Sequence, residues 1–377
     1  MRKLATIRKI TKIEPILGKD RVEMAYIDGW TAMVSKSDNF KPGDMVIFCE
    51  EDSVFPHDEQ WSFLKKYNYR IKIQRFKDGN GGYIYSQGLV LPLNVLDNKG
   101  LPKKAFLLNN DVTSLLHITQ YEPEMDIERD NKKDSSFLMR FKWYRKLRKK
   151  FKKQTGRFPK EISKTDEERI QNYISSGFDC YTDDNGILRI RNDDEYIATE
   201  KIDGQSGTFF LKKKRFLLFF NKYEYVVCSR NLVNKDPNSS YNIVSKKYDI
   251  EYVLKAILKR KDLDWVCIQG ECIGPNIQQN KYRANDYELK IFNLIDNKHG
   301  RFDTFTMKAI MDEYGLKTVP IIDVMSLKDK SVDDILKMSN GKSKLYDTLQ
   351  EGIVFRSLDG KKSFKAVSPE FLFKYSK

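Results

Sequence analysis

The chain has 377 residues, which is enough for two domains that each bury a core of their own. Its 40% hydrophobic and 12% aromatic content excludes a disordered chain, and no apolar run reaches the roughly 18 residues of a membrane-spanning helix. The formal net charge of +15 favours a polyanionic partner such as nucleic acid, although a basic protein that is merely soluble has the same composition.

The small numbers of cysteines and histidines further limit the kinds of site that the chain can form. The five cysteines include no pair separated by two residues, and there are only three histidines, so the sequence argues against a zinc site. The amino terminus lacks the apolar segment of a secretory signal. We therefore expect reduced thiols in an intracellular protein that does not enter a membrane.

Short β-prone runs separated by turns fill residues 1–100. Asp28 and Gly29 form a hairpin signal between the runs 21–27 and 30–34, and the turn 41–44 leads into the run 45–49. Further runs cover residues 69–73 and 88–92. About five strands at this spacing favour a small barrel of the OB type, which often binds single-stranded nucleic acid. An SH3-like or other small barrel without that role is the alternative.

Residues 101–160 are predicted to be a linker that contains a basic helix. Aromatic and aliphatic residues recur at helical spacing within the basic run 137–153. Such a helix can follow a phosphate backbone, lie on an anionic membrane, or dock its apolar face and leave the basic face in solvent. Thr165 followed by Glu168 is typical of a capping box, and it predicts a helix that begins there.

Residues 161–377 are predicted to form an α+β domain of antiparallel sheets with flanking helices. Strands are expected at 216–220 and 224–229. Helices are expected at 248–260, at 304–314 with a stop at Gly315, and at 331–338 with Ser331 as the N-cap. The acidic run 179–195 matches no pattern and is interpreted as an insertion.

One stretch of this second domain carries a recognisable chemical pattern. The β-prone run 196–199 is followed by Lys201, Asp203 and Gly204, and a second run resumes at 208–211. Gly204 and Gly207 permit a hairpin or tight bend between the two runs. A lysine is normally protonated at neutral pH, and a nearby cation would depress its pKa and make it a nucleophile. On this pattern alone, a surface lysine beside a turn is the simpler interpretation.

Five further polar or aromatic positions follow this stretch in a fixed order, each within or at the end of a β-prone run. With the lysine, the series is Lys201, Arg230, Glu271, Phe292, Glu351 and Lys365. It resembles motifs I, Ia, III, IIIa, IV and V of the covalent nucleotidyltransferases, which comprise ATP-dependent RNA and DNA ligases and messenger-RNA capping enzymes. The amino-terminal residues 1–5, 29–30, 43–44 and 51–56, and the segment 164–172, resemble the fifth RNA ligase family, which carries an OB domain before the nucleotidyltransferase domain.

The resemblance implies a function and a site. It implies an ATP-dependent RNA ligase that joins 3′-hydroxyl and 5′-phosphate ends, for example at a nick in a duplex, with Lys201 as the nucleophile that forms lysyl-AMP. Asp203, Glu351 and Glu271 would hold a hydrated Mg²⁺ or Mn²⁺. The ATP site would comprise Glu200, Arg230, Glu271, Phe292, Lys365, Lys362, Arg169 and Gln171.

One departure from the family pattern concerns motif V. Its usual second lysine is replaced by Val367, so either Lys365 acts alone or Lys362 compensates. A monomer is the family expectation. A DNA ligase, a GTP-dependent capping enzyme and a catalytically idle RNA-binding module remain the alternatives. The chain ends twelve residues after Lys365, which leaves no room for the carboxy-terminal OB domain usual in DNA ligases and capping enzymes.

Overall fold

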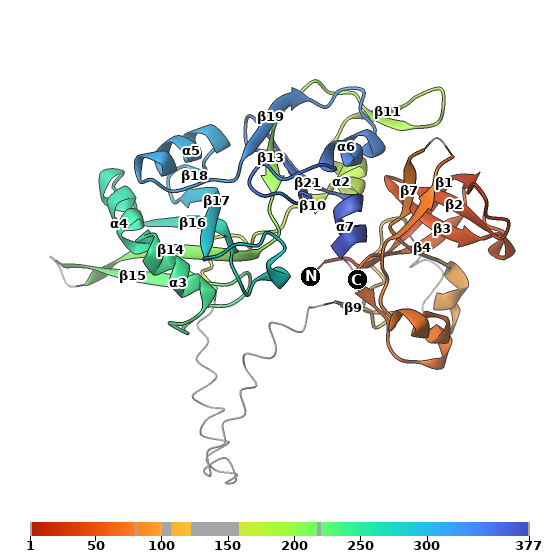
Figure 1. The fold of residues 1–377 in the computed structure, drawn as a ribbon, viewed down its shortest axis with the longest axis horizontal. Helices are drawn as coiled ribbons and strands as arrows, with labels where there is room; N and C mark the ends of the chain where they lie inside the picture. The colour runs from red at the N-terminus through yellow and green to blue at the C-terminus, as the bar shows by residue number, and fades with distance from the viewer. Residues whose placement is uncertain (1, 80, 100–106, 122–157, 217–219, 376–377) are drawn as a thin grey trace, which may run out of the picture.

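The computed structural model describes residues 2–79, 81–99, 107–121, 158–216 and 220–375. Figure 1 shows an amino-terminal barrel in red and orange, a central sheet that contains β13, and a second sheet that contains β14 and β15. The predicted basic helix at 137–153 lies outside the described residues. The predicted fold class, an OB barrel followed by an α+β domain, is confirmed.

The first domain is a five-stranded antiparallel barrel with the strand order β3-β2-β1-β4-β8. Its strands are β1 (Ala5–Pro15), β2 (Val22–Ile27), β3 (Trp30–Ser35), β4 (Met45–Glu50) and β8 (Gly88–Pro92). The predicted hairpin at Asp28 and Gly29 joins β2 to β3, and Asp28 takes a φ of 54°. The amide of Gln87 donates a 2.7 Å hydrogen bond to the carbonyl of Thr31, which brings β3 beside β8 and nearly closes the barrel.

Short elements close the ends of this barrel. They are β5 (Ser53–Val54) paired with β9 (Thr119–Gln120), β6 (Gln74–Lys77) paired with β7 (Tyr83–Ser86), and the 3₁₀ segments Lys36–Asp38, Glu59–Tyr67 and Leu93–Lys99. Val112, Leu116 and Ile118 are buried in the barrel core. Because these residues follow residue 100, we propose that the first domain extends to about Tyr121 rather than ending at the predicted boundary.

The second domain contains two five-stranded sheets. The central sheet has the order β10-β21-β20-β13-β19, and its strands are β10 (Glu168–Arg169), β13 (Glu195–Lys201), β19 (Ile321–Ser326), β20 (Gly352–Ser357) and β21 (Ser363–Val367). Tyr196 and Ala198, with apolar neighbours on β20 and β21, pack on α2 (Ile170–Gly177) and α6 (Val332–Ser339). Because strand side chains alternate, the opposite face of this sheet carries Lys201.

The second sheet has the order β15-β14-β16-β17-β18. Its strands are β14 (Gln205–Phe216), β15 (Phe220–Cys228), β16 (Trp265–Ile273), β17 (Glu288–Asp296) and β18 (Gly300–Arg301). The helices α3 (Ser240–Lys247), α4 (Ile250–Arg260) and α5 (Thr304–Glu313) pack on one of its faces. The core between them includes Leu254 of α4, Met311 of α5 and Ile291 of β17. A small hairpin, β11 (Cys180–Thr182) with β12 (Leu188–Ile190), occupies part of the acidic run that was interpreted as an insertion.

Three predicted helices are confirmed as α4, α5 and α6. Gly315, with a φ of 67°, follows the end of α5, and Ser331 caps α6 through a capping box with Asp334. The capping box predicted at Thr165 is wrong. Its hydroxyl instead hydrogen-bonds the hydroxyl of Ser206 at 2.6 Å, Glu168 belongs to β10, and α2 begins at Ile170. Tertiary pairing with β21 therefore overrides the local signal.

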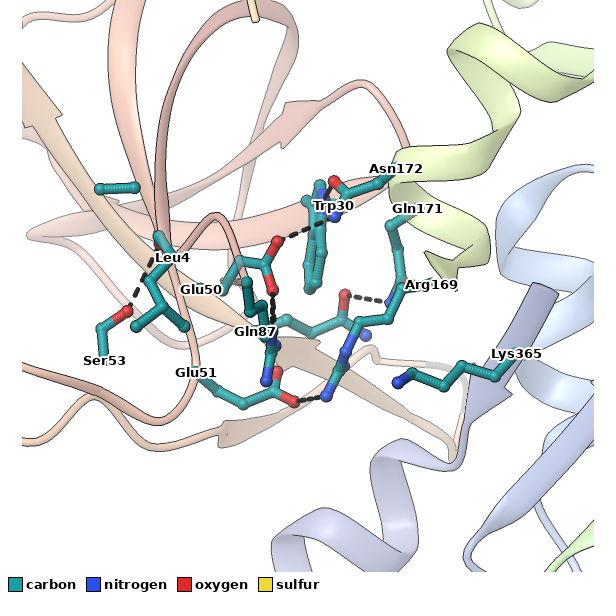
Figure 2. A network of polar contacts seen from close by, with 12 residues as sticks. Leu4, Trp30, Glu50, Glu51, Ser53, Gln87, Arg169, Gln171, Asn172 and Lys365 are labelled. Carbon is teal, nitrogen blue, oxygen red and sulfur yellow. Dashed lines mark hydrogen bonds and ion pairs between the residues drawn. The ribbon is translucent and has the colours of Figure 1, made fainter. Parts of the chain in front are cut away.

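The barrel docks on the second domain through the segment that enters α2. Figure 2 shows Arg169 paired with Glu51 of the barrel, and Asn172 between Glu50 and Trp30. The Asn172 amide donates to Glu50 at 2.8 Å, and its oxygen accepts from the Trp30 indole at 3.0 Å. The side chains of Glu51 and Arg169 are only 4% and 9% exposed, so the ion pair is buried between the domains.

Candidate functional site

The lysine stretch lies where the chain passes from one sheet to the other. Strand β13 ends at Lys201 in the central sheet, and β14 begins at Gln205 in the second sheet, so the connection is a tight bend rather than a hairpin. Position 204 has no room for a side chain and therefore requires glycine. A Cβ on it would come within 2.4 Å of the Cys272 carbonyl oxygen. The bend therefore sits directly against β16.

Lys201 is surrounded by carboxylates that come from both sheets. Its Nζ lies 2.6 Å from Oε2 of Glu351, the residue immediately before β20. Glu271 on β16 accepts a 3.1 Å hydrogen bond from the amide of Gly204. Glu271 and Asp203 also interact electrostatically with Lys201. The structure thus brings together Lys201, Asp203, Glu271 and Glu351, although Lys201 and Glu351 lie 150 positions apart in the sequence.

Burial and like charges shift the pKa values of this cluster strongly. Burial alone lowers the pKa of Lys201, but the carboxylates of Glu351 and Glu271 outweigh it and hold the net pKa above its ordinary value. Burial, and then the neighbouring carboxylates, raise the pKa of Glu271 to about 8, although Lys201 opposes this. Burial and the charge of Glu351 raise the pKa of Asp203 to about 6. Shifts of this size within one cluster are typical of a functional site.

Two residues at this site were not found from the sequence. Lys281 forms an ion pair with Asp203, and the hydroxyl of Tyr282 accepts a 2.7 Å hydrogen bond from the Asp203 amide. Both residues lie between β16 and β17, in a loop without a recognisable motif. No local signal in the sequence would have pointed to them.

A second charged group lies on the same face of the central sheet. Lys365 on β21 and Arg230, just after β15, both pair with Asp166, at 2.9 Å and 2.7 Å. Burial lowers the pKa of Lys365 to about 8. Two cations that come from different sheets therefore meet on one carboxylate. Asp166 is a further residue that sequence reasoning missed.

Glu200 and Phe292 lie close to the bend. Phe292 packs with Ile202 and Tyr346 on the face of the second sheet opposite the helices. Glu200 is 1% exposed, and its Oε2 accepts a 2.8 Å hydrogen bond from the Lys344 amide. Its Oε1 has no hydrogen-bond partner among the described residues. A buried carboxylate oxygen without a partner is an acceptor available to a ligand.

Two predicted ATP-site residues, Lys362 and Gln171, lie away from the bend, and a third, Arg169, is paired with the barrel. Lys362 pairs with Asp194, which precedes the other end of the seven-residue strand β13, on the order of 20 Å from Lys201. Gln171 is buried against the barrel, where its amide hydrogen-bonds Gln87 at 3.5 Å. Arg169 is paired with Glu51, although Figure 2 shows it close to Lys365. The geometry thus disfavours Lys362 and Gln171 as ATP ligands, because docking of the barrel engages Gln171 and strand direction separates Lys362 from the site.

The carboxylates at the bend are candidates for binding a divalent cation through its water molecules. Within the part of the chain that the structure describes, no group of three or more histidine, cysteine, aspartate or glutamate residues is arranged to ligate an ion. Glu351 nevertheless lies close enough to raise the pKa values of Asp203 and Glu271. Hard oxygen donors of this kind fit Mg²⁺ or Mn²⁺ that keeps its water molecules.

Comparisons with known proteins agree with this arrangement. An OB-fold domain model matches residues 4–93, and an RNA ligase model matches residues 194–375. The structure is similar to that of Naegleria gruberi RNA ligase with pyrophosphate, with 27% identity, a TM-score of 0.75, and coverage of 100% of this chain and 99% of that chain. A variant of that ligase with ATP and Mn has 27% identity, a TM-score of 0.74, and coverage of 100% and 98%.

A further variant of the Naegleria ligase, with AMP and Mn, has 26% identity, a TM-score of 0.75, and coverage of 100% and 99%. No curated protein sequence matches the chain significantly. Two matched domains in this order, with the lysine at the bend between two sheets, define a covalent nucleotidyltransferase. The chain belongs to the RNA ligases of that superfamily, in the family that carries an OB domain before the catalytic domain. Among the described residues, no helix is long and apolar enough to cross a membrane.

Proposed function

We propose that this ATP-dependent RNA ligase joins a 3′-hydroxyl to a 5′-phosphate, as at a nick in a duplex, through an AMP group carried on Lys201. The observation that carries the proposal is the cluster at the bend, where one partly buried lysine lies among three carboxylates. A lysine in this position has the geometry of a covalent nucleophile whose charge state is set by its neighbours. The complexes of the Naegleria ligase with ATP, AMP and pyrophosphate support the same chemistry.

The reaction has three displacements at phosphorus. Neutral Lys201 attacks the α-phosphorus of ATP, so that an N–P bond forms, the bond to pyrophosphate breaks, and the proton that the lysine nitrogen loses on becoming a phosphoramidate passes to solvent. An oxygen of the RNA 5′-phosphate then attacks the same phosphorus, the N–P bond breaks, and Lys201 leaves as the amine with a proton taken from solvent. The RNA 3′-hydroxyl finally attacks the 5′-phosphate, AMP leaves, and the hydroxyl proton is lost to solvent.

Asp203, Glu271 and Glu351 would hold a hydrated divalent cation, as the Mn complexes of the Naegleria ligase support. When bound, that cation would lower the pKa of the lysine and offset the negative charge of the phosphate. The residues themselves prepare the site. Glu351 holds the ammonium of Lys201 at 2.6 Å, and Glu271 fixes the bend through the Gly204 amide.

The adenine base would lie beside Phe292. Phe292 offers a partly exposed aromatic ring for stacking. The free Oε1 of Glu200 would accept a hydrogen bond from the exocyclic amino group of adenine, a group that guanine lacks at that position. This pair of contacts supports the use of ATP rather than GTP.

The phosphates would lie at the cations that meet on Asp166. Lys365 and Arg230 contact the same carboxylate in this structure, so each can bind phosphate oxygens when that carboxylate is displaced. We assign Lys365 to the α-phosphate of ATP and Arg230 to the ribose and the RNA 5′-phosphate. Arg169, held by Glu51, adds positive charge beside Lys365.

Labelling with α-³²P-ATP and, separately, α-³²P-GTP in the presence of Mn²⁺ tests this function. We expect the wild-type protein to retain label from ATP through a denaturing gel, and Lys201→Ala to retain none. Label from GTP alone would indicate capping chemistry. Label from neither nucleotide would leave an RNA-binding module and refute the ligase mechanism.

We further propose that the enzyme acts as a monomer inside the cell. The five cysteines are all free, and four of them are buried. Unpaired thiols of this kind are typical of a reducing compartment.

A further inference from the structure

The loop between β16 and β17 contacts the bend between Lys201 and Gln205 at three points. The side-chain Nε2 of Gln278 donates a 3.4 Å hydrogen bond to the Gly204 carbonyl, the Tyr282 hydroxyl accepts from the backbone amide of Asp203, and Lys281 pairs with the Asp203 carboxylate. The bend therefore has its backbone and its carboxylate fixed by one segment. Nothing in the reaction described above uses this segment.

The backbone of this loop is strained. Gln278, Gln279, Asn280 and Arg283 all have positive φ values, of 46°, 59°, 49° and 53°. Non-glycine residues adopt this region rarely, because it brings the Cβ atom close to the neighbouring backbone. Strain concentrated around one lysine, in contact with the catalytic bend, points to a function for that lysine.

Lys281 is also held from its other side. Its Nζ lies 5.0 Å from the ring centre of Phe371 and 5.3 Å from that of Tyr375, both on α7 (Pro369–Tyr375). These are cation–π distances. The side chain is 13% exposed. Two aromatic rings and one carboxylate thus form a specific binding site for the ammonium group of Lys281.

The charges at the bend explain why Lys281 is needed there as a second cation beside Lys201. Without Lys281, the single ammonium of Lys201 would face three carboxylates, those of Asp203, Glu271 and Glu351. Val367 adds no charge from β21, although it lies in one row with Gly352 and Lys201 on the same face of the sheet. In this chain, Lys281 is the lysine that pairs with the Asp203 carboxylate.

We propose that Lys281 is a positioning residue that holds Asp203 in the nucleotide-free enzyme and competes with the divalent cation for that carboxylate. The inference rests on the proposed function, because the competing cation is the one assigned to the ligase reaction. In the free enzyme, Lys281 keeps the carboxylates from repelling one another. When the metal is bound, it takes over the carboxylate that the lysine held.

Manganese binding to the nucleotide-free protein tests this inference. The loss of the free Mn²⁺ signal in electron paramagnetic resonance measures the affinity without any turnover. Because a competitor is removed, Lys281→Met should bind Mn²⁺ about tenfold more tightly than the wild type. Lys281→Arg retains the charge and should bind as the wild type does. In the Asp203→Asn background, Lys281→Met should bring no further gain.

Lys247→Met is the matched control, because Lys247 pairs with Asp286 at 2.7 Å outside the site. It should leave Mn²⁺ affinity unchanged. Equal or weaker binding by Lys281→Met would overturn the inference, as would the same gain in the Asp203→Asn background. Should Lys281→Met fail to fold, as judged by circular dichroism, Lys281→Gln replaces it in the same comparison. Labelling of the wild type by ATP is a separate measurement, so a failure of the ligase function would be distinguished from a failure of this competition.

Discussion

Lys201 is subject to two opposing effects, and the balance between them controls when it can react. Burial favours the neutral amine, whereas Glu351 and Glu271 favour the ammonium and prevail. A nucleophilic lysine must be neutral, so the enzyme without bound metal is held in an unreactive state. The carboxylates therefore couple the nucleophile to the arrival of the cation and ATP.

We predict that the rate of lysyl-AMP formation rises with pH from about pH 6 to about pH 9. Lys201 must lose a proton, and its pKa is raised. Asp203 and Glu271, with pKa values of about 6 and about 8, also become charged in this range and then bind metal better. Single-turnover labelling at constant Mn²⁺ measures the rate. A profile that falls across this interval would contradict the role given to these groups.

We predict that the charged form of Glu271 lowers the free energy of unfolding. Its pKa is about 8 in the folded protein and has an ordinary value of 4.5, so the folded state binds more protons between these values. Stability must then fall as the pH rises through that window. In metal-free buffer at about pH 8, Glu271→Gln should be more stable than the wild type by on the order of 1 kcal/mol, while adenylylation is lost.

Urea unfolding at two pH values measures this difference. The advantage of Glu271→Gln should shrink as the pH falls toward about 5, because the wild-type carboxyl is then protonated as well. An advantage that stays constant with pH would show that the titration of Glu271 is not its cause.

At the scale of elements, the bend between the two sheets demands a glycine. A methyl group at position 204 would meet the Cys272 carbonyl oxygen and, at 2.9 Å, Cγ of Glu271. We expect Gly204→Ala to displace the bend and to slow lysyl-AMP formation by about a hundredfold. Gly186→Ala is the control, since that position in the β11–β12 hairpin has open space and a φ of 75°. It should cost some stability and leave labelling intact.

The elements that could be predicted from sequence are those with a local signal. The 3.6-residue apolar period of α4 and the capping residue Ser331 of α6 were sufficient to find these helices. Thr165 and Glu168 carry an equally good local signal for a helix start. In the structure, however, the Thr165 hydroxyl hydrogen-bonds Ser206, and Glu168 belongs to a strand that pairs with β21. Local patterns do not contain such long-range partners.

The same limit applies to the site. Residues embedded in a motif, such as Lys201, Glu351 and Lys365, could be proposed for the site from their order along the chain. Lys281 and Asp166 have no such context, and only the folded chain brings them to Asp203 and Lys365. The structure disfavours Gln171 for the converse reason, since its segment resembles the family but its side chain faces the barrel.

At the scale of the whole molecule, one buried ion pair joins the two domains. Glu51→Gln would leave Arg169 buried without its partner, which typically costs about 3–5 kcal/mol. We expect a corresponding loss in the free energy of unfolding by urea. The double variant Glu51→Met with Arg169→Met should recover much of that loss, because it leaves no isolated charge. Equal stability of Glu51→Gln and the wild type would contradict the structural role of this pair.

The central claim is that Lys201 carries AMP on its way to RNA, and a pulse-chase measurement tests it most directly. Enzyme labelled with α-³²P-ATP is freed of ATP and mixed with a nicked duplex that bears an RNA 3′-hydroxyl and a 5′-phosphate. We predict that the label leaves the protein, appears on the RNA 5′-end, and is released as AMP while the strands become joined. Label that stays on the protein, or joined strands without a labelled RNA intermediate, would contradict the mechanism.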